Sequence, residues 1–174
     1  MTQVEVRMCG LGGQGVVLAG QILGRAAVYD GKNVVQTQSY GAEARGSAAK
    51  SEVIISDQRI GYPLVRKCDV LVALTQETLD ANIKDLKEAA VLLVDEDLVK
   101  QVPETKSSVH RLPLTKTAQA ELESEMYANV VMLGALTKIT RIVSRGVMEK
   151  AITLSVKPDT AKANLTAFEK GYSL

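Results

Sequence analysis

Apolar and polar positions divide the first half of the chain into short segments of two kinds. Runs of β-branched and other apolar residues predict β-strands over residues 4–9, 33–38, 50–56, 69–75 and 90–95. Apolar residues at helical spacing predict α-helices over residues 16–30 and 75–89. Continuous apolar strands separated by helices are typical of a sheet covered on both faces. The pattern therefore predicts an α/β fold with three layers and a mostly parallel, Rossmann-like sheet flanked by helices.

The second half of the chain changes to a helical pattern from about residue 114. Helices are predicted over residues 114–122, 127–143, 146–156 and 159–172. The sequence contains no internal repeat, no low-complexity tract and no segment with the composition of a linker. We therefore expect a single domain over residues 1–174, with the helical portion at its C-terminal end.

Composition narrows the classes of function. The chain has 174 residues, of which 46% are hydrophobic, and its 21 Lys and Arg residues nearly balance 20 Asp and Glu residues. No basic stripe with interleaved aromatic residues occurs, so a nucleic-acid partner is not expected. The apolar stretches are shorter than the roughly 18 residues of a membrane span, and the first residues lack the pattern of a signal peptide. We expect a cytoplasmic protein without membrane contact.

Few residues outside the glycine-rich segments are candidates for chemistry. Cys9 and Cys68 lie in separate apolar stretches without a CxxC spacing, so we expect no iron–sulfur cluster or zinc site on this chain. Cys9 is expected to behave as a small hydrophobic residue. The lone histidine, His110, has no paired acid or thiol and is expected to be structural. The acidic run at residues 95–97 predicts a helix N-cap, and Gly134 indicates close helix packing or a partner contact.

The glycine cluster GLGGQG stands between the first predicted strand and the first predicted helix. Gly10, Gly12 and Gly15 have the GxGxxG spacing, which lets a chain turn sharply and bring backbone N–H groups to a phosphate or carboxylate. A dinucleotide site also needs an acid at the end of the second strand, where this sequence has Gln36 and Gln38. A nicotinamide site is therefore disfavoured, and a tight turn without a ligand stays open as an alternative.

A second glycine-bearing loop, SYGAEARG, follows the second predicted strand. In a parallel sheet this loop would lie at the same carboxyl edge as GLGGQG, where ligands and partners collect. Arg45 offers a planar fork for phosphate or carboxylate, and Tyr40 is of a type favoured at interfaces. The side-chain amide of Gln14 could reach a ligand or a partner backbone. A solvated loop with a weak ion pair between Glu43 and Arg45 is the alternative.

These motifs occur in an order that resembles the gamma subunit, or gamma domain, of the 2-oxoacid:ferredoxin oxidoreductases. The resemblance rests on GLGGQGVVLAGQIL, QSYGAEARG, SEVIISDQRI and CDVLVAL, and it continues with LPLTKTAQAEL, YANVVMLGAL and ANLTAFEKGY. It extends over nearly the whole chain. One departure is Ser47, which stands where the family pattern has a second glycine after Arg-Gly.

The resemblance implies a subunit of an enzyme that converts a 2-oxoacid, coenzyme A and oxidised ferredoxin into acyl-CoA, carbon dioxide and reduced ferredoxin. Thiamine diphosphate and iron–sulfur clusters would be held by alpha and beta subunits, with a ferredoxin-like delta subunit as a further candidate partner. This chain would be a non-catalytic subunit that contributes to assembly and to the region through which coenzyme A enters. Pyruvate, 2-oxoglutarate and branched-chain oxoacids all stay open as substrates, and the likeness leans towards 2-oxoglutarate.

The residues expected at this site come from the two glycine-bearing loops. They are Gly12, Gly13, Gln14, Gly15, Ser39, Tyr40, Glu43 and Arg45. No catalytic residue and no metal ligand are expected on this chain. Two other functions stay open on the sequence alone. A stand-alone nicotinamide- or flavin-dependent enzyme would bind its cofactor unaided, and a binding module would hold a phosphorylated metabolite without large partners.

Overall fold

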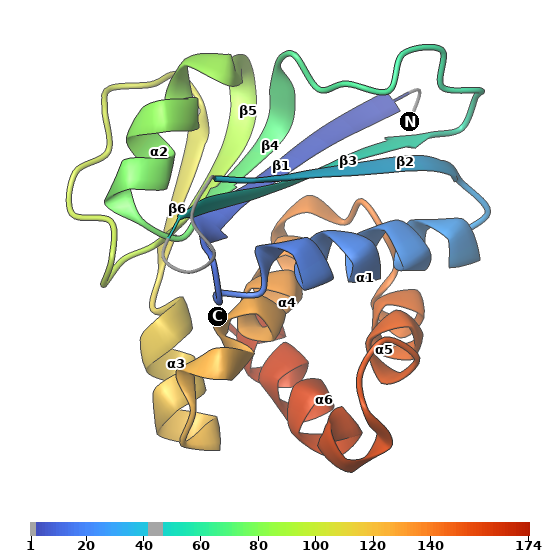
Figure 1. Ribbon diagram of the computed structural model, residues 1–174, viewed down its shortest axis with the longest axis vertical. Helices are drawn as coiled ribbons and strands as arrows, with labels where there is room; N and C mark the ends of the chain where they lie inside the picture. The colour runs from blue at the N-terminus through green and yellow to red at the C-terminus, as the bar shows by residue number, and fades with distance from the viewer. Residues whose placement is uncertain (1–2, 42–46) are drawn as a thin grey trace.

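The computed structural model describes residues 3–41 and 47–174, in which six strands form one sheet (Figure 1). The strands follow one another across the sheet in the order β2-β3-β1-β4-β5-β6. Their bounds are Gln3–Leu11 (β1), Asn33–Tyr40 (β2), Ala48–Ser56 (β3), Cys68–Ala73 (β4), Leu86–Asp95 (β5) and Ser108–Leu112 (β6).

Six α-helices and two short 3-10 helices accompany the sheet in the described part of the chain. The α-helices are Val16–Tyr29 (α1), Gln76–Asn82 (α2), Leu114–Leu122 (α3), Ala128–Thr140 (α4), Arg145–Thr153 (α5) and Pro158–Tyr172 (α6). The 3-10 helices are Ile83–Asp85 (η1) and Glu125–Tyr127 (η2). The four helices predicted after residue 114 are confirmed. Across the described ranges, no helix combines the length and the apolar character needed to cross a membrane.

The sheet is mostly parallel, as predicted, but one strand runs against the others. β1 pairs in parallel with β4, β4 with β5, and β5 with β6. β3 is antiparallel to both of its neighbours, β1 and β2. The short connection after Tyr40 explains this order, because a short loop can join antiparallel strands only. β2 therefore has the same direction as β1 but lies two positions away from it (Figure 1).

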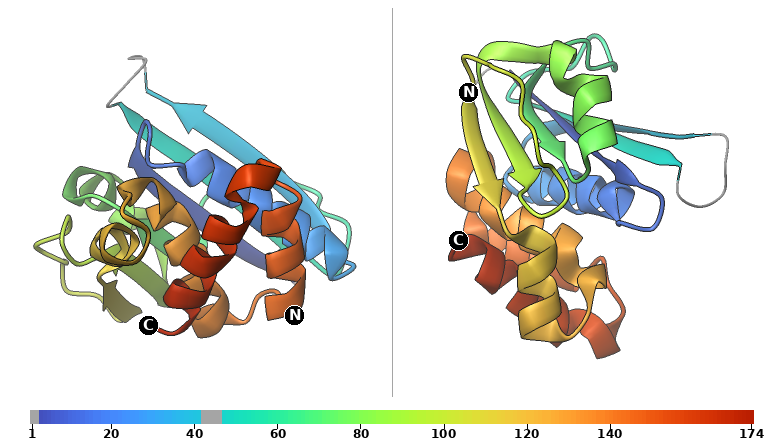
Figure 2. Two further views of the ribbon diagram at one scale, coloured as in Figure 1. Left: turned by 90° about the horizontal axis from the view of Figure 1, so that it is seen from below. Right: turned by 90° about the vertical axis from the view of Figure 1, so that its left-hand side faces the viewer.

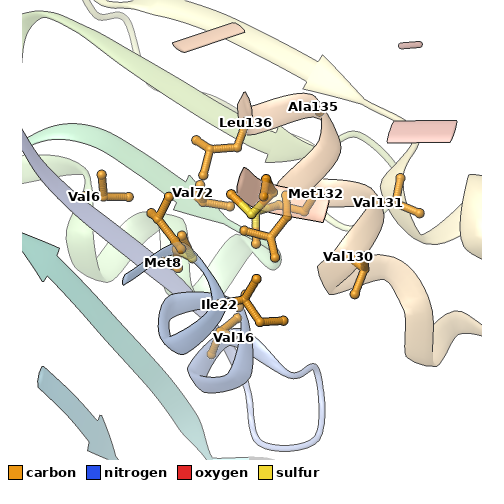
Figure 3. Packing of buried hydrophobic residues seen from close by; sticks show 14 of the residues in the cluster. Val6, Met8, Val16, Ile22, Val72, Val130, Val131, Met132, Ala135 and Leu136 are labelled. Carbon is orange, nitrogen blue, oxygen red and sulfur yellow. The ribbon is translucent and has the colours of Figure 1, made fainter. Parts of the chain in front are cut away.

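Helices cover the two faces of the sheet unequally, which gives the three predicted layers (Figures 1 and 2). α1 and α4 lie against one face, with α5 and α6 packed behind them, and α2 lies on the other face. Side chains alternate between the faces along each strand, so Met8 points to the larger helical layer and Cys9 to the smaller one. Figure 3 shows Met8 among residues of α1 and α4, including Ile22 and Met132. The larger of the two cores lies there.

α4 and α6 pack backbone against backbone. A Cβ atom added at Gly134 would overlap the carbonyl oxygen of Phe168, and one added at Gly171 would overlap that of Val131. The close-packing interpretation of Gly134 is therefore confirmed. This contact fixes the position of α4, whose first turn meets the segment that follows β1.

Two details of the predicted element pattern are wrong. The helix predicted over residues 75–89 gives way at Asp85, because the chain from Leu86 onward pairs with β4 as strand β5. The register between these strands shifts near this point, and Ala89 takes φ 56° in the irregularity. The edge strand Ser108–Leu112 is absent from the prediction, because its alternation contains polar and charged residues that give a weak hydrophobic signal.

Candidate functional site

The turn that follows β1 is closed by its own glutamine. The N–H of Gln14 donates to the carbonyl oxygen of Leu11 at 3.0 Å, and Gln14 Oε1 accepts from the N–H of Leu11 at 2.7 Å. Gly10 makes room for this side chain, since a Cβ atom there would lie 2.7 Å from Gln14 Oε1. The sequence suggests an outward role for Gln14. Its oxygen is engaged inside the turn, so an outward contact would have to use the amide nitrogen.

The residue that starts α1 is held from outside the turn. Gly15 has φ 71°, a left-handed conformation that favours glycine. Asn129, in the first turn of α4, donates from Nδ2 to the carbonyl oxygen of Gly15 at 3.2 Å. Asn129 is 4% exposed, and a Cβ atom on Gly15 would overlap its amide group. Sequence reasoning missed Asn129, although a lone amide in the apolar run YANVVMLGAL is a signal that could have found it.

The described ends of the second loop, residues 40–41 and Ser47, lie at the same edge of the sheet as the glycine turn. The N–H of Gly12 donates to the carbonyl oxygen of Ser47 at 2.8 Å. β3 makes this link possible, because it starts from the second loop and runs directly beside the end of β1. Glu43 and Arg45 lie outside the described residues, and their place at this edge stays a prediction.

A shallow hollow of about 230 Å³ separates the glycine turn from the end of β2. Tyr40 is 62% exposed beside it. A Cβ atom on Gly13, which has φ 103°, would meet nothing within 4 Å. α1 starts at this hollow without a side-chain cap, so the positive end of its dipole lies there. The lining residues are Leu11, Gly12, Gly13, Gly15, Val16, Val17, Tyr40 and Ala49.

Two predicted site residues line other hollows. Ser39 precedes Tyr40 on β2, so its side chain points to the opposite face of the sheet. There it borders a hollow of about 270 Å³ together with Cys9 and Lys50. Gln14 borders a third hollow of about 270 Å³, between the turn and η2. The structure thus brings Gly12, Gly13, Gly15 and Tyr40 together around one hollow, and Ser39 lies at a second hollow that Tyr40 also borders.

Both thiols are unsuited to nucleophilic or ligand chemistry. Burial raises the pKa of the Cys9 thiol to about 12 and that of the Cys68 thiol to about 11, so both are protonated near neutral pH. Cys9 behaves as a buried apolar side chain, as expected. Over residues 3–41 and 47–174, no group of three or more His, Cys, Asp or Glu side chains could hold a metal ion.

The buried acid Asp95 caps a helix through space. Its Oδ2 accepts hydrogen bonds from the N–H of Thr115 at 2.8 Å and from the Thr115 hydroxyl at 2.6 Å. Thr115 lies in the first turn of α3, whose N-cap is Pro113, so Asp95 satisfies a backbone N–H at the start of a helix about twenty residues further along the chain without occupying the expected N-cap position. His110 lies on β6 and shares a hydrogen bond of 3.0 Å with the Ser108 hydroxyl.

A buried ion-pair network lies on the smaller face of the sheet, around the middle of β1. Arg7 Nε donates to Glu52 at 2.7 Å, and Arg7 Nη1 donates to Asp85 at 2.5 Å. Arg7 Nη2 donates to the carbonyl oxygen of Val65 at 2.9 Å. Arg7 is 3% exposed, so the network joins β1, β3 and η1 inside the protein. Its role is structural.

Comparisons with known proteins match the chain along most of its length. The family model described as pyruvate ferredoxin/flavodoxin oxidoreductase matches residues 5–174. The chain is 54% identical over 173 residues to 2-oxoglutarate synthase subunit KorC of Methanocaldococcus jannaschii, with 98% of this chain and 92% of that protein covered.

Solved structures show the same fold. The gamma subunit of a keto/oxoacid ferredoxin oxidoreductase from Geobacter sulfurreducens is 46% identical and has a TM-score of 0.88, with 98% of this chain and 96% of that chain covered. A 2-oxoglutarate:ferredoxin oxidoreductase from Magnetococcus marinus has a TM-score of 0.87 at 23% identity. It covers 99% of this chain but only 31% of its own, so there the fold is one part of a longer chain.

Proposed function

This chain belongs to the pyruvate ferredoxin/flavodoxin oxidoreductase family and is the gamma subunit of an oxoacid:ferredoxin oxidoreductase, and from that premise we propose that it is an accessory subunit. In this role it assembles with the larger subunits and forms part of the region through which coenzyme A enters. The cofactor chemistry takes place on the partners.

The chemistry of the described side chains supports the accessory role. Both thiols are buried and protonated, and the described side chains form no cluster that suits a metal. Thiamine diphosphate and iron–sulfur clusters would then be held by alpha and beta subunits, with a ferredoxin-like delta subunit as a further partner. Thiamine diphosphate would supply decarboxylation of the oxoacid, and the clusters would supply electron transfer to ferredoxin. The recurrence of the fold inside a longer chain agrees with assembly against neighbouring domains.

The hollow between Gly13 and Tyr40 carries the proposal for coenzyme A. It combines an uncapped helix start, a glycine that nothing crowds and an exposed aromatic ring. An uncapped helix start favours phosphate, and an exposed tyrosine ring offers a flat surface to a base. Coenzyme A has both chemical groups. The 2-oxoacid is proposed to be 2-oxoglutarate, on the basis of the relative from Methanocaldococcus jannaschii.

A pair of glycine substitutions in the assembled complex tests the coenzyme A proposal. Gly13 and Gly31 both have positive φ, 103° and 74°, and a Cβ atom at either would meet nothing within 4 Å. Gly31 follows α1 at its other end. Gly13→Val and Gly31→Val both place a β-branched side chain in open space at a positive φ, at opposite ends of α1, with the greater strain at Gly13. We expect Gly13→Val to raise the KM for coenzyme A about tenfold or more, with the KM for 2-oxoglutarate unchanged, whereas Gly31→Val leaves both unchanged.

Equal effects of the two substitutions on the KM for coenzyme A would contradict this role for the hollow. The accessory role has its own test. The full chain is co-expressed with the reading frames beside it, and the purified complex is assayed for ferredoxin reduction with pyruvate, 2-oxoglutarate and 2-oxoisovalerate. Activity confined to this chain alone, without thiamine-containing partners, would contradict the accessory role, and preference for another oxoacid would contradict the substrate.

The stand-alone nicotinamide alternative conflicts with the order of the strands. A dinucleotide site uses an acid at the end of the strand that neighbours β1 on the appropriate side. Here β3 occupies that place and runs in the opposite direction, while β2 ends in polar uncharged residues one strand further away. The geometry therefore favours the accessory subunit.

A further inference from the structure

We propose that Gln14 and Asn129 are positioning residues that fix the glycine turn from its two sides. The inference rests on the proposed function, because it assigns these residues to the surface at which coenzyme A would enter. Neither residue needs to touch the ligand. Each acts through the backbone that carries Gly13 and the start of α1.

The first side of the turn is fixed from within. Gln14 Oε1 holds the N–H of Leu11 at 2.7 Å, while the N–H of Gln14 holds the carbonyl oxygen of the same residue at 3.0 Å. Leu11 therefore has both backbone groups bonded to one residue. The side chain fits only because Gly10 lacks a Cβ atom. Gly10, the first glycine of the motif, thus makes room for the Gln14 side chain and is not needed for ligand binding. We call the hydrogen bonds of Gln14 and Asn129 to the turn its two braces.

The second side is fixed from α4. Asn129 Nδ2 donates to the carbonyl oxygen of Gly15, and the amide occupies the volume that a side chain at Gly15 would fill. Asn129 is buried, and its helix is itself locked to α6 at Gly134. The last glycine of the motif therefore receives a bond from a helix that cannot easily shift. Between the two braces, Gly13 faces open space.

The glycines of the motif therefore have different roles. Gly10 and Gly15 accommodate amide side chains, and Gly13 leaves the surface open. A turn held by hydrogen bonds on both sides is ordered before a ligand arrives, which lowers the entropy lost on binding. Loss of a brace should therefore affect the order of the turn first and the binding of coenzyme A second.

Peptide-level amide hydrogen exchange on the assembled complex tests the proposal. Asn129→Ala and Gln14→Ala should speed exchange of the segment over residues 10–18 by about tenfold, the factor that one hydrogen bond supplies. Gln14→Glu keeps an acceptor for the N–H of Leu11 and should restore slow exchange. Asn164→Ala is the matched control, because Asn164 is 7% exposed and its Nδ2 also donates to a backbone carbonyl, that of Thr160 in α6. It should leave the turn unchanged.

A KM measurement separates this inference from the proposed function. Faster exchange with a raised KM for coenzyme A supports both. Faster exchange with an unchanged KM supports the braces and contradicts the coenzyme A role. Unchanged exchange in Asn129→Ala and Gln14→Ala, or an equal rise in Asn164→Ala, overturns the positioning role.

Assembly supplies a second measurement if a single variant fails to fold. Gly15→Ala should prevent assembly, because its Cβ atom would overlap the Asn129 amide. Adding Asn129→Ala to the same chain removes that overlap and should recover the complex, with a fast-exchanging turn. Failure of the double variant to recover any complex would overturn the direct coupling between the two residues.

Discussion

Cys9 and Cys68 show how burial decides the chemistry of a side chain. The pKa of each thiol is raised by burial, to about 12 and about 11. We therefore expect the native chain to react slowly with iodoacetamide at pH 8 and both thiols to react fully in denaturant, as counted by mass spectrometry. Fast labelling of Cys9 in the native chain would show that the site is more open than the structure indicates.

The same shifts predict how stability depends on alkaline pH. A thiol whose pKa is higher in the folded chain binds its proton more tightly there, so its contribution is fully present below the unfolded pKa of about 9. The free energy of unfolding should fall as the pH rises from about 9 towards 12. Cys9→Ala should flatten part of this fall in urea titrations at several pH values, and an unchanged slope would contradict the assignment.

Substitution of Arg7 should change the free energy of unfolding more than substitution of Cys9. Replacing Arg7 with Met leaves the buried Glu52 with Lys50, at 3.5 Å, as its remaining cation, which should lower the free energy of unfolding by about 3 kcal/mol. Arg7→Met combined with Glu52→Gln removes that buried charge and should recover part of the loss. Urea titrations of the full chain measure both. If the single and double variants were equally unstable, desolvation of Glu52 would not be the cause.

The role of a residue could be predicted from the sequence only where a local motif indicated it. The glycine spacing and Tyr40 led to the carboxyl edge, and the structure places them there together. The brace from Asn129 could not be derived, because the two bonded residues lie 114 positions apart. The sequence predicts an outward role for Gln14 because it does not show that Gly10 leaves space for the Gln14 side chain inside the turn.

At the scale of elements, the crossing of α4 and α6 depends on two glycines. Gly134→Ala would place a methyl group against backbone atoms of α6 and should lower the free energy of unfolding by about 1–3 kcal/mol. Gly146→Ala in α5 meets nothing within 4 Å and should change stability by no more than about 1 kcal/mol, in the stabilising direction. Thermal and urea unfolding measure the pair. Equal effects would mean that the helices can move apart freely.

The elements that were predicted well are those with a strong apolar period. α4 can be predicted because most of its residues are buried and apolar, and α6 because Pro158 marks its start. β1, β3 and β4 can be predicted because they are buried on both sides. The end of α2 was misjudged because apolar residues in the start of β5 suit either periodicity. β6 could not be predicted because the formation of a polar edge strand depends on pairing with its neighbour, here β5, more than on its own composition.

At the scale of the whole molecule, the position of β3 predicts what the chain does not bind. With β2 displaced from β1, the full chain should show no saturable binding of NADH in a calorimeter. A lactate-type dehydrogenase run under the same conditions provides the positive control. Saturable binding would contradict the subunit interpretation and revive the stand-alone enzyme. The fold class could be predicted from periodicity, whereas the strand order could not, because the direction of β3 depends on the loop that precedes it.

The buried pair of Arg7 and Glu52 also has a consequence for how the chain reaches this structure. The two residues are directly opposite each other in the ladder between β1 and β3. A slip of one residue in β3 would move Glu52 to the other face of the sheet, among apolar side chains, and leave Arg7 unmatched. Wrong registers are thereby penalised during folding. The ion pair therefore favours the native register of β3, the strand that is antiparallel to both of its neighbours.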